Sequence, residues 1–597
     1  MGAENRSPPM RRRTFLATLP AAALIPAAAS AAPTVYPGVS AGNRIAGAHF
    51  AGRSAVWGTS GAAATAHPIA TLLAIDILRR GGSAVDAAIA ANAALGFLEP
   101  TANGIGGDCF VMLWDPAKKT VVGLNGSGRS PRGLSLAEVR RRSPKDHIPA
   151  YGAVSVSVPG TVDAWWSMHQ RYGKLPWREV LEPVVALCER GAPVPQTIAW
   201  YLDRNMARFS NTGGVPIEEI ENARRVYMPN GRTPREGEVF RNPDLARTLA
   251  TIAQGGRDAF YDGPLADHME RYFKRIGGWM TRRDLAAHRT EWVAPIRTSY
   301  RGVDVWGLPP NSQGLSTLQL LNIVEQFDMK AMGFQSAASI HHQAEAKRLA
   351  FEDRARWFAD PAFSRTPIEH LNSKAYAAER AKLIRPDRVM ERVMPGDAPF
   401  RGDTTYFTTA DKDGMMVSII QSNYRGMGSG LVPDGPDGRT LGFMFQDRGE
   451  LFALRDGHPN IYAPGKRPFQ TIIPGFASQG DKPWLSFGVM GGDMQPQGQA
   501  QIIINMVDYG LGVQEAGDAP RWHHEGSSEP TGEPQQGTGT LRLETGVPAE
   551  TKAKLAAMGW KLGEPDGGFG GYQAILAGPE AYGAASEMRK DGLALAY

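Results

Sequence analysis

Residues 403–408 read Asp-Thr-Thr-Tyr-Phe-Thr, and this short stretch decides how the rest of the chain is interpreted. Threonine and aromatic residues favour strands, so the composition alone predicts only the opening of a β-strand. Most Thr-Thr pairs at the start of a strand have no meaning beyond this preference. The pair at 404–405 therefore gains a chemical meaning only from the sequence around it.

Several familiar catalytic patterns are missing from the sequence. It contains no Gly-x-x-x-x-Gly-Lys-Ser/Thr loop, no Gly-x-Ser-x-Gly elbow and no His-Glu-x-x-His helix. The pairs His341-His342 and His523-His524 are adjacent rather than four residues apart, so we expect no metal and no cofactor. The glycine-rich run 426–430 lacks the strand–helix context of a phosphate loop and is expected to be a flexible substrate loop.

Glycine and proline landmarks flank the 403–408 stretch on both sides. They are Leu98-Glu99-Pro100, Gly104-Ile105-Gly106-Gly107, Pro159-Gly160-Thr161-Val162, Tyr172-Gly173, Pro309-Pro310, Lys466-Arg467-Pro468, Gly491-Gly492 and Asp518-Ala519-Pro520-Arg521. With these landmarks in this order, the chain resembles the gamma-glutamyltranspeptidases, members of the N-terminal-nucleophile hydrolases, from about residue 45 to its end. The resemblance implies an α+β fold, a four-layer αββα sandwich formed by two chains cut from one precursor.

In that family the precursor cleaves itself before a threonine, and the match places the cut between Asp403 and Thr404. The Thr404 hydroxyl would attack the Asp403 carbonyl and form an ester, which water then releases. The freed α-amino group, with an ordinary pKa of about 7.7–8.0, can accept the hydroxyl proton near neutral pH. The resemblance therefore implies a large subunit, residues 32–403, and a small subunit, residues 404–597, joined in one interlocked heterodimer.

The family supports this nucleophile with backbone donors and a hydroxyl group. Gly491 and Gly492 match the glycine pair whose N–H groups stabilise the oxyanion, and an ordinary tight turn is the alternative interpretation. Ser422 aligns with a family threonine that hydrogen-bonds the nucleophile, and this exchange keeps a hydroxyl donor and acceptor. Thr405 is expected to begin the strand and support its neighbour.

Substrate recognition departs from the family pattern. The family holds the α-carboxylate of a gamma-glutamyl group with an arginine whose position here is Ser127. Arg129 follows two residues later, which displaces it by about 6–7 Å in an extended segment. Asp447 and Glu450 retain acidity where the family binds the α-amino group, and Gln470-Thr471 replaces a common pair of serines.

These departures favour an amidase over an efficient transpeptidase. The segment from His458 to Gly465 is also short and lacks the longer lid of many transpeptidases. We expect hydrolysis, with transfer as a second outcome, of gamma-glutamyl or related acyl amides such as glutathione. Similar branches of the family act on glutaryl side chains of cephalosporins or on small amides such as oxamate, and these are the alternatives. The non-enzymatic alternative, a processing-dead extracytoplasmic binding protein, is disfavoured by the retained Thr404, Gly491 and Gly492.

Length and composition limit these expectations. The 597 residues include 69 glycines and 44 prolines, and 65 basic against 60 acidic side chains give a net charge of +5. Length alone predicts three or four domains, whereas the resemblance predicts one interlocked core. No run of five basic residues occurs, so nucleic acid is not an expected partner. The expected partners are a small-molecule amide and the two subunits of the same precursor.

The N-terminus has the pattern of an export signal. Arg11-Arg12-Arg13-Thr14-Phe15-Leu16 precedes an alanine-rich apolar run, and Ala29-Ser30-Ala31 offers a small-residue cleavage site. We expect residues 1–31 to be a twin-arginine-type signal peptide, with a basic tail as the alternative, and the protein to be periplasmic or secreted. The run contains Pro20 and Pro26 and is too short for a span of about 20 residues, so no stable membrane span is expected.

The two cysteines and the hydrophobic periodicity give expectations about disulfides and secondary structure. Cys109 and Cys188 stand in unrelated surroundings, which favours two buried thiols over one disulfide. Between residues 160 and 395 the pattern is mostly helical, and after 403 short strands predominate. Helices are expected as a pair within 65–98 and at 161–172, 177–189, 242–254, 340–358 and 496–509, and strands at 109–114, 120–124, 406–410, 416–421, 471–476, 485–489 and 574–577.

Overall fold

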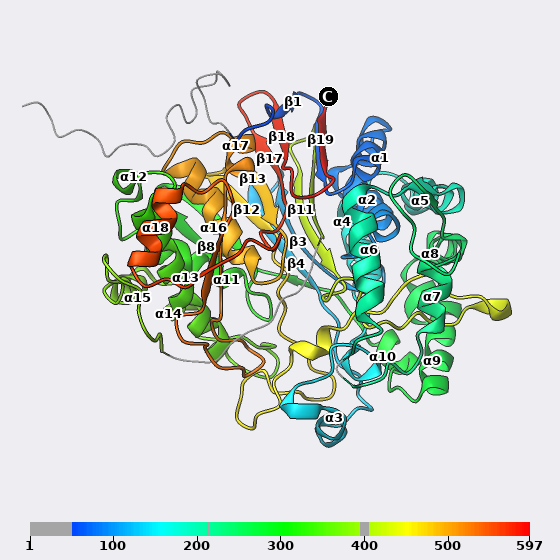
Figure 1. The fold of residues 1–597 in the computed structure, drawn as a ribbon. Coiled ribbons are helices and arrows are strands. Elements are labelled where there is room, and N and C mark those ends of the chain that lie inside the picture. Colours follow the sequence, from blue (N-terminus) through cyan, green and yellow to red (C-terminus); the bar gives the residue numbers. More distant parts are fainter. Residues whose placement is uncertain (1–49, 213, 395–404) are drawn as a thin grey trace, which may run out of the picture.

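The structure is a computed structural model that describes residues 50–212, 214–394 and 405–597. Two seven-stranded antiparallel sheets pack face to face between layers of helices, as the four-layer prediction requires (Figure 1). The predicted signal peptide, residues 1–31, and the predicted cleavage site, Asp403 and Thr404, lie outside the described residues.

The first sheet contains the strand that follows the cleavage site. Its order is β19 (Leu593–Ala596), β2 (Gly61–Thr65), β10 (Thr405–Asp411), β11 (Met416–Ser422), β3 (Asp108–Asp115), β4 (Thr120–Gly126) and β7 (Glu291–Val293). Strand β10 is central, and its alternate side chains are buried on both faces. Tyr406 packs between the sheets, whereas Phe407 packs toward the helices.

The second sheet lies against the first across a hydrophobic core. Its order is β1 (Val56–Gly58), β18 (Tyr582–Ser586), β17 (Tyr572–Ala577), β13 (Lys482–Val489), β12 (Gly475–Gln479), β9 (Val303–Gly307) and β8 (Ile296–Tyr300). Phe110, Trp114 and Phe476 help to fill the space between the sheets. A Cβ atom on Gly488 would lie 2.3 Å from the Tyr406 ring, so glycine is required where the sheets approach most closely.

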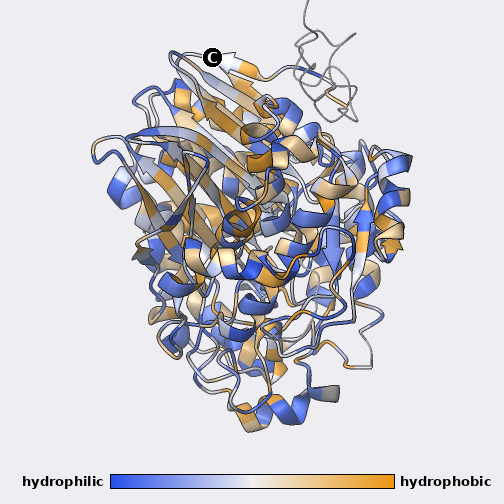
Figure 2. Cartoon of the chain, turned by 90° about the vertical axis from the view of Figure 1, so that its left-hand side faces the viewer, coloured by the Kyte–Doolittle hydropathy of each residue, from blue (hydrophilic) through white to orange (hydrophobic). Residues whose placement is uncertain are grey.

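Helices cover the outer face of each sheet. The pair α1 (Pro68–Arg79) and α2 (Ala84–Leu98) packs on the first sheet, and Ser83 and Asp86 form a capping box that starts α2. On the second sheet lie α11 (Gly314–Val324) and α16 (Met494–Val507), with α13 (Ala337–Trp357) packed on α11. The strands are largely hydrophobic, and hydrophilic residues are common on the surrounding helices (Figure 2).

Most predicted elements are confirmed, including α4 (Thr161–Tyr172), α5 (Trp177–Arg190), α8 (Pro243–Tyr261) and α16. Cys109 in β3 and Cys188 in α5 are both buried free thiols, as expected. No helix among the described residues combines the length and apolar character that crossing a membrane would need.

One predicted strand is wrong in its bounds. The strand expected at 471–476 begins only at Gly475, because the preceding backbone bonds side chains instead of a strand; the Ile473 N–H, for instance, donates to Gln495 Oε1 at 2.9 Å. The interval 160–395 is mostly helical, as predicted, and it also contains the strands β7, β8 and β9. These strands are short, and their period-2 pattern is obscured by the longer helices around them.

Candidate active site

The site is assembled around the N-terminal end of β10. Thr405 pairs with Gln421 of β11, and its Oγ1 donates to Glu99 Oε2 at 2.7 Å, just beyond the end of α2. Ser422 is the last residue of β11 and lies opposite Asp108 of β3. The neighbour of Thr404 in the chain is therefore held in the middle of the first sheet, and Ser422 lies one register position beyond it.

A glycine turn joins β13 to α16 at this end of the sandwich. Gly491 has φ 104° and Gly492 has φ 57°, values at which a side chain is strained. Neither N–H donates to a backbone carbonyl of the described chain, whereas their carbonyls accept from the Met494 and Gln495 N–H groups and start the helix. The turn thus presents two adjacent amide donors, the arrangement that stabilises an oxyanion.

Gln313 fixes this turn from behind. Its Nε2 donates to the carbonyls of Gly492 at 3.0 Å and Thr471 at 2.5 Å, and its Oε1 accepts from Arg354 Nη1 at 2.6 Å. Arg354 is fully buried and also donates to Asp493 Oδ1 at 2.6 Å and to Glu529. Sequence reasoning missed both Gln313 and Arg354, and the one available signal was that Gln313 follows the Pro309-Pro310 landmark.

The two predicted acidic residues differ in what they offer a substrate. Glu450 forms a two-pronged ion pair with Arg425, with Arg425 Nη2 donating to Oε1 at 2.6 Å, so its charge is already neutralised. Asp447 Oδ1 accepts from the Arg425 N–H at 3.0 Å, and Oδ2 is buried without a partner in the described part of the chain. Burial holds the pKa of Asp447 well above its usual value.

Gln470 and Thr471 lie beside a buried arginine that the sequence did not single out. Gln470 Nε2 donates to Asp108 Oδ2 at 2.7 Å, and Thr471 Oγ1 accepts from Arg448 Nη1 at 3.0 Å. Burial raises the pKa of Asp108 to about 6 and lowers that of Arg448 to about 10. Arg448 stood next to the predicted Asp447 in the sequence, but nothing in the pattern indicated which way its side chain points.

Ser127 and Arg129 are committed to other contacts. Ser127 Oγ donates to Asn125 Oδ1 at 2.6 Å and accepts from Asn311 Nδ2 at 3.2 Å. Arg129 donates to Asp360 Oδ2 at 3.1 Å and to Glu291 Oε1 at 3.3 Å. Arg129 could take over the role of the family arginine only if its loop shifted, because its guanidinium group already binds two carboxylates.

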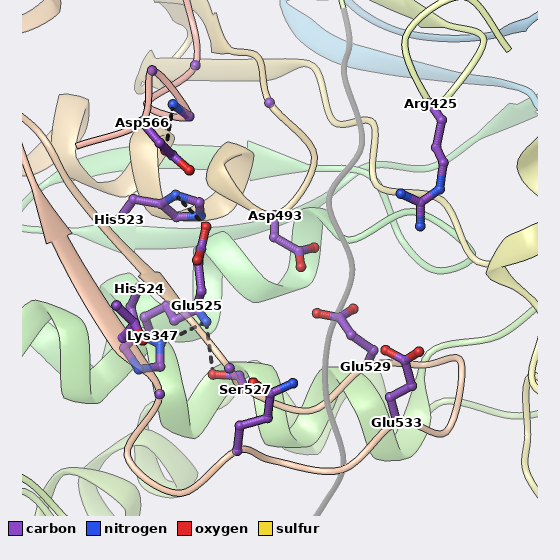
Figure 3. Close-up of a pocket in the computed structure, with 18 of the residues that line it drawn as sticks. Lys347, Arg425, Asp493, His523, His524, Glu525, Ser527, Glu529, Glu533 and Asp566 are labelled. Carbon is purple, nitrogen blue, oxygen red and sulfur yellow. Dashed lines mark hydrogen bonds and ion pairs between the residues drawn. The ribbon is translucent and has the colours of Figure 1, made fainter. Parts of the chain in front are cut away.

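A cavity of about 1150 Å³ opens beside the glycine turn, and Gly491 and Asp493 are part of its wall. In Figure 3, Arg425 faces Asp493, Glu529 and Glu533 across this space. Lys347 also lines the cavity, and its Nζ donates to Ser527 Oγ at 2.9 Å. Further lining residues are Trp200, Tyr201, Arg204 and Arg208. Among the residues that the structure describes, no three His, Cys, Asp or Glu side chains cluster closely enough to hold a metal ion.

Comparison with known proteins agrees with this architecture. A sequence model of the gamma-glutamyltranspeptidase family matches residues 70–597. The glutathione hydrolase proenzyme of Escherichia coli (strain K12) is 31% identical over 557 residues, covering 90% of this chain and 92% of that protein. The glutathione hydrolase-like YwrD proenzyme of Bacillus subtilis (strain 168) is 36% identical over 469 residues, 78% of this chain and 85% of that protein. The crystal structure of cephalosporin acylase from Bacillus halodurans superposes with a TM-score of 0.84 at 39% identity, covering 91% of this chain and 97% of that chain.

The paired sheets, the glycine turn and these relatives define an enzyme of the N-terminal-nucleophile hydrolase class. Within that class, the chain belongs to the gamma-glutamyltranspeptidase family.

Proposed function

We propose that this protein cleaves itself between Asp403 and Thr404 and then hydrolyses amides through the new N-terminal Thr404. The observation that carries the proposal is the Gly491-Gly492 turn, which presents two amide donors at the same end of the sandwich as the start of β10. The names of the relatives in Escherichia coli and Bacillus subtilis describe proenzymes, which supports a processed precursor.

The proposed reaction has two steps, acylation of Thr404 and hydrolysis of the acyl ester. The Thr404 hydroxyl adds to the substrate carbonyl while its proton passes to the α-amino group, and the amine leaves with that proton as the acyl ester forms. Water then adds to the ester and releases a carboxylic acid, which regenerates the hydroxyl. Gly491 and Gly492 stabilise the oxyanion in both steps, and Ser422 hydrogen-bonds the nucleophile. No cofactor is needed for either step.

The preferred substrates are gamma-glutamyl amides. Three buried oxygens at the end of β11 have no hydrogen-bond donor in the described chain, and they belong to Gln446, Asp447 and Gln470. Buried polar atoms are almost always paired, so unpaired acceptors in one place suit an ammonium group of a ligand. Glutaryl-type acyl groups, which lack that ammonium, are the second candidate, because Glu450 is neutralised by Arg425 and because the cephalosporin acylase is the 39% identical neighbour.

We further propose the course of maturation. Residues 1–31 would act as a twin-arginine-type signal for export to the periplasm or beyond, leaving residues 32–403 and 404–597 as the two subunits. The basic run 11–13 and the small residues 29–31 support this order of events.

A denaturing gel with mass spectrometry tests the central step. The purified wild-type protein should yield a 194-residue fragment that begins at Thr404, and Thr404→Ala should remain one uncut chain without amidase activity. The processed protein should release 4-nitroaniline from gamma-glutamyl-4-nitroanilide or glutaryl-4-nitroanilide. A wild-type chain that stays uncut, or a processed chain inactive on both compounds, would contradict the proposal.

A further inference from the structure

Arg448 lies near the end of β11 and therefore near the start of β10, the strand that follows the proposed nucleophile in the chain. The preceding N–H, that of Asp447, donates to the Asn423 carbonyl at 3.2 Å, and Asn423 comes directly after Ser422 of β11. Arg448 itself opens the short 3₁₀ helix Arg448–Leu451 and is fully buried. A guanidinium group is rarely buried unless it has partners that satisfy its charge and its five donors.

Among the described residues, one edge of this guanidinium group has no hydrogen-bond partner. Nη1 donates to Thr471 Oγ1 at 3.0 Å, and one face lies 5.1 Å from the Tyr424 ring centre. Nε and Nη2 are buried and make no hydrogen bond within the described chain. Their N–H groups point in parallel from the same side of the group, which is the fork that binds both oxygens of a carboxylate.

Asp108, the carboxylate that attracts Arg448 most strongly, is not hydrogen-bonded to this fork. Asp108 attracts Arg448 electrostatically, but Asp108 Oδ1 accepts from the Gly128 N–H at 2.8 Å and from Gln446 Nε2 at 2.9 Å, and Oδ2 accepts from Gln470. Asp108 thus balances part of the positive charge and leaves the two Arg448 donors to another anion.

The other cations around the site are already engaged. Arg425 pairs with Glu450, and Arg354 pairs with Asp493 and Glu529. Arg129 binds Asp360 and Glu291. Among the described residues at this end of the sandwich, Arg448 is therefore the buried arginine whose Nε and Nη2 are both left without a hydrogen bond.

Arg448 is also connected to the glycine turn through one side chain. Thr471, which accepts from Arg448, gives its carbonyl to Gln313 Nε2, and the same Nε2 reaches the Gly492 carbonyl. The fork and the two oxyanion donors are thus held by one continuous set of hydrogen bonds.

We propose that Arg448 is the residue that binds the carboxylate of the substrate's acyl group, in place of an arginine at position 127 or 129. This inference rests on the proposed amidase function and names the acyl class, a glutaryl chain with or without an α-ammonium group. Its carboxylate would accept from Nε and Nη2, and an α-ammonium group would donate to Asp447 Oδ2.

Two substrates that differ only at the end of the acyl chain provide the test. Glutaryl-4-nitroanilide carries the carboxylate, and pentanoyl-4-nitroanilide carries a methyl group in its place. The processed wild-type enzyme should prefer the glutaryl compound by about 100-fold or more in kcat/KM, because a buried fork without its anion is penalised. Arg448→Met should remove most of this preference, so that the kcat/KM values for the glutaryl and pentanoyl compounds come within about threefold of each other, whatever change the variant causes in both rates together.

Two further variants serve as controls. Arg448→Lys keeps the charge without the fork and should retain only about a tenth of the wild-type preference. Arg129→Met should keep the full preference, since its guanidinium group is committed elsewhere. Self-cleavage of each variant, followed on a denaturing gel, reports that it has folded.

The outcomes separate this inference from the proposed function. A processed, active enzyme whose preference for glutaryl survives Arg448→Met, or is lost in Arg129→Met, overturns the role of Arg448 alone. A wild-type chain that neither cleaves itself nor hydrolyses any of the amides contradicts the proposed function instead. If Arg448→Met does not self-cleave, two other measurements test the inference. They are the competitive inhibition of the wild type by glutarate compared with pentanoate, and the substrate preference of Arg448→Lys. Equal inhibition by the two compounds overturns the inference.

Discussion

Individual buried polar side chains determine the geometry of this site. Gln313 uses one amide group to hold the Gly492 carbonyl, the Thr471 carbonyl and the Arg354 guanidinium group. Such contacts join residues far apart in the sequence, 179 positions in the case of Gln313 and Gly492. A single sequence could therefore predict the glycine pair from its landmarks but not the glutamine that supports it, because hydrogen bonding between distant residues leaves no local pattern.

Lys347 provides a pH test at the same scale. Burial lowers the pKa of Lys347 to about 7, against 10.5 for an exposed lysine. Between these two values the unfolded chain binds one proton more than the folded chain, so Lys347 makes stability rise with pH in this window. The parent for this test is the uncut Thr404→Ala chain. The difference between the thermal unfolding midpoints, Lys347→Met minus the parent, should fall by about 2 °C from pH 7 to pH 9.

The control for this experiment is the exposed Lys412 in the turn between β10 and β11. Lys412→Met should show a difference from the parent that does not change with pH. A constant difference for Lys347→Met as well would show that Lys347 stays charged when folded.

At the scale of elements, the glycine turn between β13 and α16 connects the fold to its chemistry. Strand β13 pairs with β12 and β17, so the start of the turn is fixed by the second sheet, and α16 fixes its end. Both elements were predicted, at 485–489 and 496–509, from a β-rich and a helical composition bounded by turn residues. The dihedral angles of the turn could not be predicted, although two successive glycines are typical of positive φ values.

Gly491→Ala tests this turn. The new Cβ atom would lie 3.3 Å from Gly570 Cα and from Met494 Cβ, and φ 104° is strained for alanine, so the backbone should shift and misalign the oxyanion donors. We expect kcat for gamma-glutamyl-4-nitroanilide to fall by about 100-fold, as for the loss of one oxyanion donor.

Gly277→Ala is the matched control for the backbone strain. Gly277 also has positive φ, 75°, but ends α9 (Pro264–Ile276) in open space away from the site. It should lower stability by about 1 kcal/mol and leave kcat unchanged. Equal kcat values for both variants would argue against an oxyanion role for the turn.

For the whole molecule, the two proposed subunits share both sheets. The segment before residue 404 contributes β1, β8 and β9 to the second sheet and β2, β3, β4 and β7 to the first, and the later segment supplies all other strands of both sheets. Strand β10 pairs on one side with β2 and on the other with β11, which itself pairs with β3. The length-based expectation of several domains misses this interleaving, because strand pairing between distant segments is not visible in local periodicity.

The interleaving predicts how the processed protein behaves. The two fragments should elute together in size-exclusion chromatography at high salt and should unfold in one transition, because separating them would break both sheets and expose the core between them. Guanidinium chloride should be needed to separate them. Dissociation of folded fragments in buffer would contradict the shared-sheet architecture.

Trapping the acyl-enzyme tests the central claim most directly. The processed enzyme is mixed with glutaryl-4-nitroanilide, quenched in acid within one turnover and examined by intact mass and peptide mapping. We predict one glutaryl group on the 194-residue fragment, attached at its N-terminal Thr404, and none on Thr404→Ala. A glutaryl group on any other residue, or turnover by the Thr404→Ala chain, would contradict the account.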